Sequence, residues 1–135
     1  MDSSDRLGAT YTVLSLDGIH LVTVGSPVPL RGQERARATS LRRLVFELHA
    51  VGVAEVFLEA RQDMLDKRDV MVVRGARFDL PKGTRLRVEH RRGGEEPLLW
   101  IADIVAGVVR ASMEGEPSYH QIIKGQIRLI EVDCS

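Results

Sequence analysis

Two carboxylates occupy positions where an acid can do chemistry. Asp103 lies in the apolar run LLWIADIVAGVV, where a charge is costly unless it is paired, solvated in a cleft or bound to a cation. Glu59 ends the apolar segment VAEVFLEA, and ligands of open α/β sheets bind beyond the carboxyl ends of the strands. Together the two acids could bind Mg²⁺ or Mn²⁺, either of which can activate water for phosphodiester hydrolysis.

Each acid also has a purely structural interpretation. Asp103 could form the exposed polar edge of its helix, or bridge to a basic side chain on a neighbouring element. Glu59 could pair with Arg61, two positions along on the same face of the strand. The residues alone leave both interpretations open for both acids.

Basic residues gather in two segments, which is a pattern that can bind phosphate groups. Residues 31–43 hold five arginines against one glutamate, and residues 82–92 hold five basic residues against one glutamate. Because the arginine fork is bidentate, nucleic acid could bind through these patches, although solvated faces explain them equally. His90 is the histidine retained as a possible neighbour of the site. The four histidines show no metal-ligand spacing, so a zinc site is not expected.

The overall composition limits the class of protein. In 135 residues, 19 basic and 19 acidic side chains cancel, so no global field attracts nucleic acid or a membrane. A single cysteine, Cys134, excludes an intrachain disulfide. The N-terminus does not resemble a signal peptide, and the longest apolar run is too short to span a bilayer. We therefore expect a cytoplasmic protein.

Hydrophobic periodicity predicts alternating helices and strands. Helices are expected over residues 3–16, 33–50, 63–73 and 97–115, and strands over 19–24, 53–60, 84–90 and 127–132. Asp63 is the expected N-cap of the third helix, and Asp66 is expected at its third helical position, close to free backbone N–H groups. This order predicts a single α/β domain over residues 1–135 with a largely parallel sheet.

Two segments of the chain carry a resemblance to a known family. The runs QERARATSLRRLVFELHAVGVAEVFLEARQDMLDKRD and RLRVEHRRGGEEPLLWIADIVAGVVRA resemble uncharacterised bacterial proteins related to a ribonuclease-H-like domain family of unknown function. The resemblance covers about residues 18–113, and IADIVAG is its most specific part. It implies a ribonuclease-H-like mixed sheet flanked by helices. It also implies that Glu59 and Asp103 are acids of a Mg²⁺ or Mn²⁺ site, with Arg61 as a neighbour.

The chain departs from this family at its start. Family members open with a strand bearing an Asp-Glu-Ser type motif that supplies the leading metal ligand, and no such strand occurs here. We therefore expect a ribonuclease-H-like domain that is incomplete at its N-terminus. Its acidic site would be degenerate and inactive, and its open sheet edges would favour pairing with another copy. The alternative is a non-enzymatic module that binds protein or nucleic acid.

Overall fold

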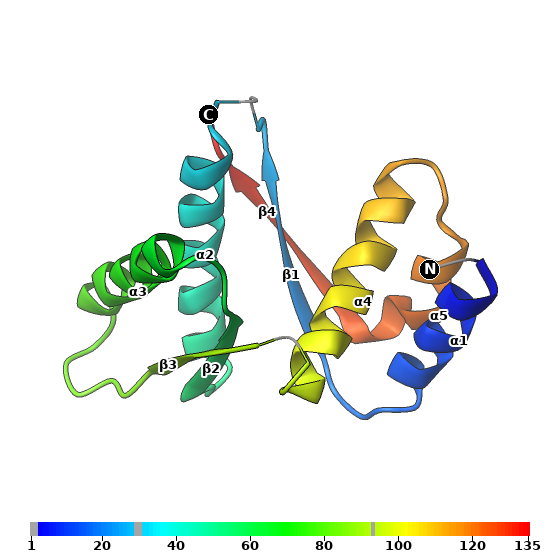
Figure 1. Ribbon diagram of the computed structural model, residues 1–135, viewed down its shortest axis with the longest axis horizontal. Helices are drawn as coiled ribbons and strands as arrows, with labels where there is room; N and C mark the ends of the chain where they lie inside the picture. Colours follow the sequence, from blue (N-terminus) through cyan, green and yellow to red (C-terminus); the bar gives the residue numbers. More distant parts are fainter. Residues whose placement is uncertain (1–2, 29–30, 93) are drawn as a thin grey trace. The chain divides into compact units, whose positions relative to one another are not determined.

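The computed structural model describes residues 3–28, 31–92 and 94–135 (Figure 1). Contacts divide the chain into two compact units. The first unit comprises Met1–His20 and Gly93–Arg128, and the second comprises Leu21–Arg92 and Leu129–Ser135. The expectation of one domain over residues 1–135 stays a prediction.

The first unit is made of helices. It contains α1 (Ser3–Leu14), α4 (Pro97–Met113), α5 (Ser118–Ile123) and a 3₁₀ turn at Lys124–Gln126. Helix α4 begins as the sequence predicts: Pro97 occupies the first turn, and the Glu96 side chain accepts a hydrogen bond from the Leu98 N–H. All three α-helices contact one another. Their buried residues include Val13, Val108 and Ile123.

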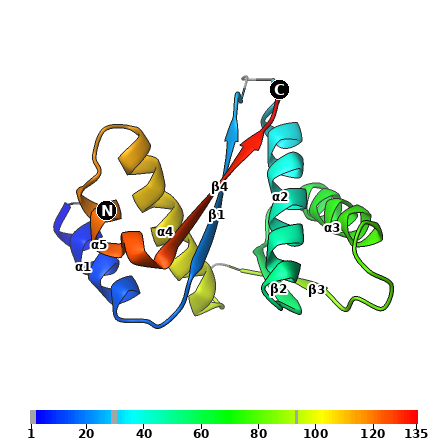
Figure 2. The ribbon, with the colours of Figure 1, turned by 180° about the vertical axis from the view of Figure 1, so that it is seen from behind.

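The second unit combines helices with short strands. Its elements are α2 (Gln33–Ala50), β2 (Glu55–Glu59), α3 (Asp63–Phe78) and β3 (Arg87–Arg91), together with all but the first residues of β1 (His20–Ser26) and β4 (Ile127–Asp133). Strands β2 and β3 pair in parallel, with Glu55 opposite Arg87 and Glu59 opposite Arg91. Strands β1 and β4 form a second pair and point the same way (Figures 1 and 2). The expected α/β class is confirmed, but the described strands form two small parallel sheets instead of one larger sheet.

In the second unit, the β2–α3–β3 segment packs against α2 through one apolar core. Helices α2 and α3 pack side by side (Figures 1 and 2). Their apolar faces meet one face of the β2–β3 pair. The core cluster consists of buried Leu41, Val45, Val73, Ala76, Leu80 and Leu86, with Val56, Leu58, Val72 and Val88 packed against it. The carboxyl ends of both strands and the start of α3 are thereby held next to α2.

Three features of the helices differ from the sequence predictions. Helix α3 runs to Phe78, past the expected end at residue 73, because Val73 and Ala76 continue its buried face through the exposed Gly75. Asp63 is not the N-cap; Gln62 takes that position and Asp63 begins the helix. Helix α5 was not predicted, because six residues are too few to show a helical period. No helix within the described ranges is long and apolar enough to cross a membrane.

A tight contact near the end of β1 yields the first prediction. A Cβ added to Gly25 would lie 2.6 Å from Cys134 Sγ and 2.9 Å from Ser40 Oγ. We expect Gly25→Ala to lower the free energy of unfolding by about 1 to 3 kcal/mol, measured by urea denaturation, because neighbouring side chains must move. Adding Cys134→Ala should restore part of the loss.

Gly75→Ala is the matched control for this prediction. It lies inside α3 with nothing within 4 Å of the added Cβ. It should stabilise the protein by roughly 0.5 to 1 kcal/mol, since alanine favours a helix over glycine. If Gly25→Ala were as well tolerated as Gly75→Ala, the close approach of β1, β4 and α2 would be wrong.

Candidate functional site

The most unusual side chain of the second unit is a buried carboxylate on α3. Asp69 is only 3% exposed. Arg37 of α2 donates to both of its oxygens, with Nε 3.2 Å from Oδ1 and Nη2 3.0 Å from Oδ2. Arg61, which follows β2, donates from Nη2 to Oδ1 at 2.6 Å. Two guanidinium groups therefore compensate the burial of one charge.

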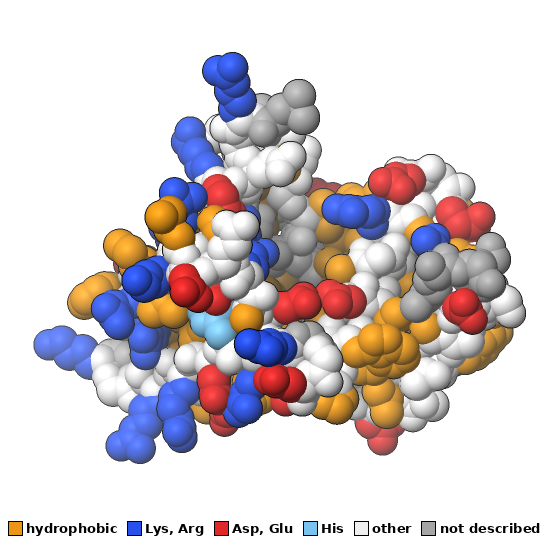
Figure 3. Space-filling view, in the orientation of Figure 1, with side chains coloured by type: hydrophobic (Ala, Val, Ile, Leu, Met, Phe, Trp, Pro, Cys, Tyr) orange, Lys and Arg blue, Asp and Glu red, His pale blue; other side chains and the backbone are white. Residues whose placement is uncertain are grey.

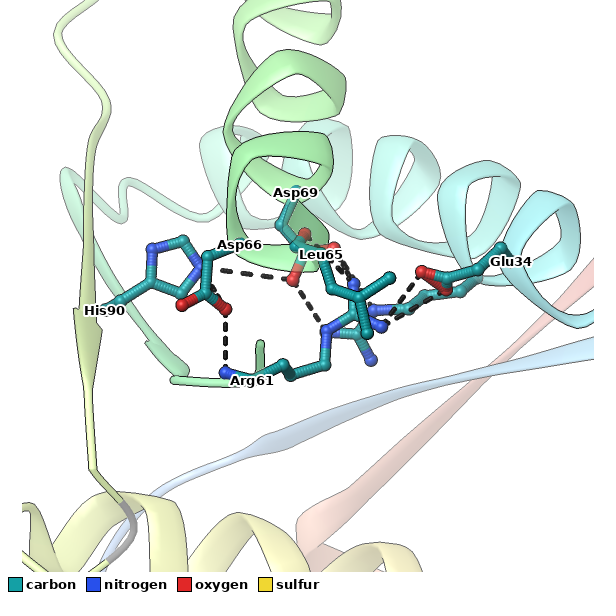
Figure 4. A network of polar contacts seen from close by, with 7 residues as sticks. Glu34, Arg61, Leu65, Asp66, Asp69 and His90 are labelled. Carbon is teal, nitrogen blue, oxygen red and sulfur yellow. Dashed lines mark hydrogen bonds and ion pairs between the residues drawn. The ribbon is translucent and has the colours of Figure 1, made fainter. Parts of the chain in front are cut away.

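Arg61 connects this carboxylate to two further acids. Its Nη1 donates to both carboxylate oxygens of Glu34 on α2, at 2.9 and 3.1 Å. Its backbone N–H donates to Asp66 Oδ1 at 2.7 Å. Figure 4 shows Arg61 extended between the start of α3 and α2, with Glu34 at one end and Asp66 at the other. A single residue thus fixes the side chains of Glu34, Asp66 and Asp69.

His90 brings a nitrogen ligand to the same place. It lies near the end of β3, paired with Leu58 of β2, and its ring points at α3 (Figure 4). Its Nε2 lies 3.6 Å from Asp66 Oδ1 and 3.9 Å from Asp69 Oδ2. This nitrogen is buried and has no hydrogen-bond partner among the described residues. One ligand atom from each of Asp66, Asp69 and His90 lies within 4.8 Å of the others.

The charges of the network set the ionisation of its members. Burial acts to raise the pKa of the Asp69 carboxyl, but hydrogen bonds and charge from Arg37 and then Arg61 outweigh it, and the pKa is lowered. Burial acts to lower the pKa of Arg61, but Glu34 and Asp69 outweigh it, and the pKa is raised. Asp69 is therefore a carboxylate and Arg61 a cation at neutral pH.

A groove adjoins the network between α2 and α3. It has a volume of about 250 Å³ and is lined by Glu34, Arg37, Ala38, Arg68, Asp69, Met71 and Val72. Arg37 uses Nε and Nη2 on Asp69 and its side chain is 42% exposed. Its Nη1 has no hydrogen-bond partner among the residues that the structure describes and could bind an anion. Arg68 is exposed on the same groove. An anionic group could therefore bind beside the carboxylates.

Glu59 does not belong to this network. Leu58 packs on the core, so alternation along β2 places Glu59 on the other face of the sheet together with Phe57. On that face, the Arg91 guanidinium lies 5.3 Å from the centre of the Phe57 ring. Glu59 is exposed, and Arg61 pairs with Glu34 and Asp69 instead of Glu59.

Asp103 lies in the first unit, on α4. Its side chain is exposed, as are its neighbours Ala102, Ala106 and Gly107, and it forms no ion pair with any residue that the structure describes. The helix buries Leu99, Ile104, Val105, Val108 and Val109, and Asp103 is on its solvent side. The placement of Glu59 and Asp103 in different units leaves their pairing at one metal a prediction.

Of the residues singled out in the sequence, Arg61 and His90 both lie against Asp66 and Asp69. Sequence reasoning missed Asp69, and it placed Arg37 and Glu34 only within the basic segment 31–43, not in a network with Asp69. The spacing of Asp66 and Asp69 was an available signal, since residues three apart share a helix face directly after a strand. No known family model matches the chain, and no curated protein or solved structure is significantly similar to it. The ribonuclease-H-like resemblance therefore stays a prediction.

Proposed function

We propose that the second unit binds a divalent metal ion through Asp66, Asp69 and His90 and uses it to hydrolyse phosphodiester bonds. The observation that carries the proposal is the convergence of two carboxylates and one imidazole, with ligand atoms within 4.8 Å of one another. They meet at the carboxyl end of a parallel β–α–β segment, where ligands of such folds bind.

The ligand set favours Mn²⁺ over Mg²⁺. Carboxylate oxygens suit both ions, but imidazole nitrogen suits transition metals, and Mg²⁺ prefers oxygen ligands. A cation would also neutralise charge at Asp66, whose carboxylate has one hydrogen bond within residues 3–28, 31–92 and 94–135, from the Arg61 backbone N–H. Asp69 already faces two arginines, so we expect it to bind the ion weakly and Asp66 and His90 to dominate.

The neighbouring arginines supply the rest of the chemistry. Arg37 and Arg68 on the groove would hold the non-bridging oxygens of a phosphodiester close to the ion. The ion would lower the pKa of a bound water and so supply a hydroxide for attack on phosphorus. The bond to the leaving oxygen would break, and the proton given up by the water would balance the proton that the leaving oxygen takes up from solvent. Glu59 and Asp103 are not needed for this site and remain proposed members of the acidic pair implied by the resemblance.

The test is a titration of the full chain with MnCl₂, followed by thermal unfolding and isothermal calorimetry. At millimolar metal we expect a rise in melting temperature, because an ion bound only by the folded state stabilises it. Asp66→Asn should abolish the rise. Asp63→Asn is the matched control, since Asp63 is an exposed acid one turn away on the same helix.

Two results would count against the site. The proposal fails if neither Mn²⁺ nor Mg²⁺ shifts the wild-type melting temperature. The melting-temperature shift could also survive Asp66→Asn but be lost in Glu59→Gln or Asp103→Asn. That result would mean that the ion binds at Glu59 and Asp103, the acidic pair inferred from the sequence.

A second candidate is a non-enzymatic module that binds nucleic acid. It is favoured by the charge of the second unit, where 15 Lys and Arg residues stand against 11 Asp and Glu residues, a net charge of +4. In Figure 3 basic side chains are dense over α2, α3 and β3. Salt-sensitive binding of an oligonucleotide without cleavage, with and without Mn²⁺, would support this candidate over hydrolysis.

A further inference from the structure

Helix α3 carries an exposed stripe on the side opposite its core face. Met64, Met71 and Phe78 follow at seven-residue intervals and are 69%, 69% and 85% exposed. Lys67 and Arg74 lie between them on the same side and are also exposed. Seven residues rise about 10.5 Å and return to nearly the same side of a helix. The stripe therefore alternates apolar and cationic side chains along the whole helix.

Helix α1 of the first unit has an exposed apolar stripe of its own. Leu7, Tyr11 and Leu14 are spaced by four and three residues and are 43%, 53% and 40% exposed. The opposite side of the helix, with Val13, is buried against α4 and α5. The apolar repeat that predicts this helix in the sequence therefore lies on its exposed side. An exposed apolar helix face of this kind is typical of an interaction surface.

The charges of the two units are opposite. The first unit has 4 Lys and Arg residues against 8 Asp and Glu residues, a net charge of −4, whereas the second has +4. On α1 itself Asp5 and Arg6 cancel, and Asp17 follows the helix, so the acidic excess of the unit comes from residues outside α1. The α1 stripe therefore belongs to an acidic unit, and the α3 stripe to a basic one. Because the two charges cancel, the net charge of the whole chain does not show that one unit is acidic and the other basic.

We propose that α1 of one copy of this protein docks on the exposed stripe of α3 in a second copy. Apolar side chains spaced by seven residues suit a neighbouring helix that runs alongside, because the stripe stays in contact with it. The cations on α3 would face the acidic unit of the other copy. Pairing of α3 with a second α3 would instead bring Lys67 and Arg74 against the same cations.

This inference is independent of the proposed metal site. Asp66 lies beside Lys67 and Arg74, and Met71 also lines the groove. None of Asp66, Asp69 and His90 belongs to either stripe, however, so association is measured on the protein without added metal and does not depend on metal binding. Each copy offers both stripes, so the contact can close reciprocally into a dimer or continue into a larger assembly.

The test is the mass of the full chain in solution, measured by size-exclusion chromatography with light scattering at micromolar concentration. We expect a mass at least twice the 15.0 kDa of the monomer in low salt, and a lower mass in high salt. The double variant Lys67→Glu with Arg74→Glu should be monomeric, as should Tyr11→Glu. The matched control, Lys82→Glu with Arg85→Glu, reverses two exposed charges outside the stripe and should keep the wild-type mass.

Circular dichroism of each variant checks that it is folded before its mass is interpreted. A monomeric wild-type chain would overturn the proposal. So would an assembly that persists in the Lys67→Glu, Arg74→Glu variant, since α1 would then pair elsewhere. If that variant instead loses salt-sensitive binding of a uridine 20-mer while the wild type is monomeric, the stripe is a nucleic-acid surface and self-association is wrong.

Discussion

Replacement of Asp69 by asparagine is expected to lower the free energy of unfolding by about 3 kcal/mol at neutral pH. Asp69 is only 3% exposed and accepts hydrogen bonds from both Arg37 and Arg61. The amide keeps the shape of the carboxyl but removes its charge. Arg61, with a 22% exposed side chain, then retains Glu34 as its one charged partner in the part of the chain that the structure describes. Equilibrium urea denaturation measures the loss.

The pH dependence of stability follows from the same carboxyl. The pKa of Asp69 in the folded state is lowered from the ordinary value of 3.8. Below that ordinary value, the unfolded chain binds the proton more readily than the folded protein does. The stabilisation is thus fully present at neutral pH and is lost as the pH falls through the folded pKa. The difference between wild type and Asp69→Asn should shrink over that acidic range.

Asp63→Asn serves as the control for this prediction. Asp63 is an exposed carboxyl on the same helix, and surface changes of this kind alter stability by less than about 0.5 kcal/mol. An Asp69→Asn variant as stable as Asp63→Asn at neutral pH would mean that the arginines do not compensate a buried charge at this site.

His90→Gln is expected to reduce Mn²⁺-dependent hydrolysis of bis(p-nitrophenyl) phosphate by at least about 100-fold, since replacing even outer partners of a metal site costs 10- to 100-fold. Its Nε2 is buried and faces both Asp66 and Asp69. Loss of the nitrogen leaves only carboxylates for the ion. Release of p-nitrophenolate, followed by absorbance, measures the rate.

His49→Gln is the comparison for His90→Gln, because His49 lies near the end of α2 and is no part of the network. The two variants should differ strongly in rate while melting at similar temperatures without metal. Equal rates for both would remove His90 from the proposed chemistry.

Local sequence patterns predict the elements of the second unit well. Helix α2 runs over Gln33–Ala50, the range expected from its apolar repeat and the following Gly52. The end of α3 was harder, because Gly75 resembles a stop signal. The helix continues there only because Val73 and Ala76 bury their side chains against α2 and the sheet, which is a tertiary effect.

The site could be predicted only in part, for a related reason. Arg61 follows β2, Asp66 lies in the first turn of α3, and His90 lies near the end of β3. Their position at one sheet edge is therefore a local consequence of β–α–β pairing. Glu34 and Arg37 reach the site because α2 packs against α3 in one register, which no pattern in the sequence specifies. In the sequence, Asp69 has the pattern of an ordinary helix carboxylate. It is the packing of α2 against α3 that buries its side chain.

Asp103 illustrates the opposite error. Its apolar neighbours in the sequence suggest a buried charge, yet α4 exposes Asp103 together with small residues and buries only the other side of the helix. The chemistry available in the second unit rests on Asp66, Asp69 and His90 instead.

Electron spin echo spectroscopy of the Mn²⁺-loaded protein tests the proposed metal site most directly, because it detects nitrogen bound to the ion. We predict modulation from one imidazole nitrogen in the wild type and none in His90→Gln. A wild-type spectrum without nitrogen modulation at saturating Mn²⁺, or modulation that persists in His90→Gln, would contradict the site.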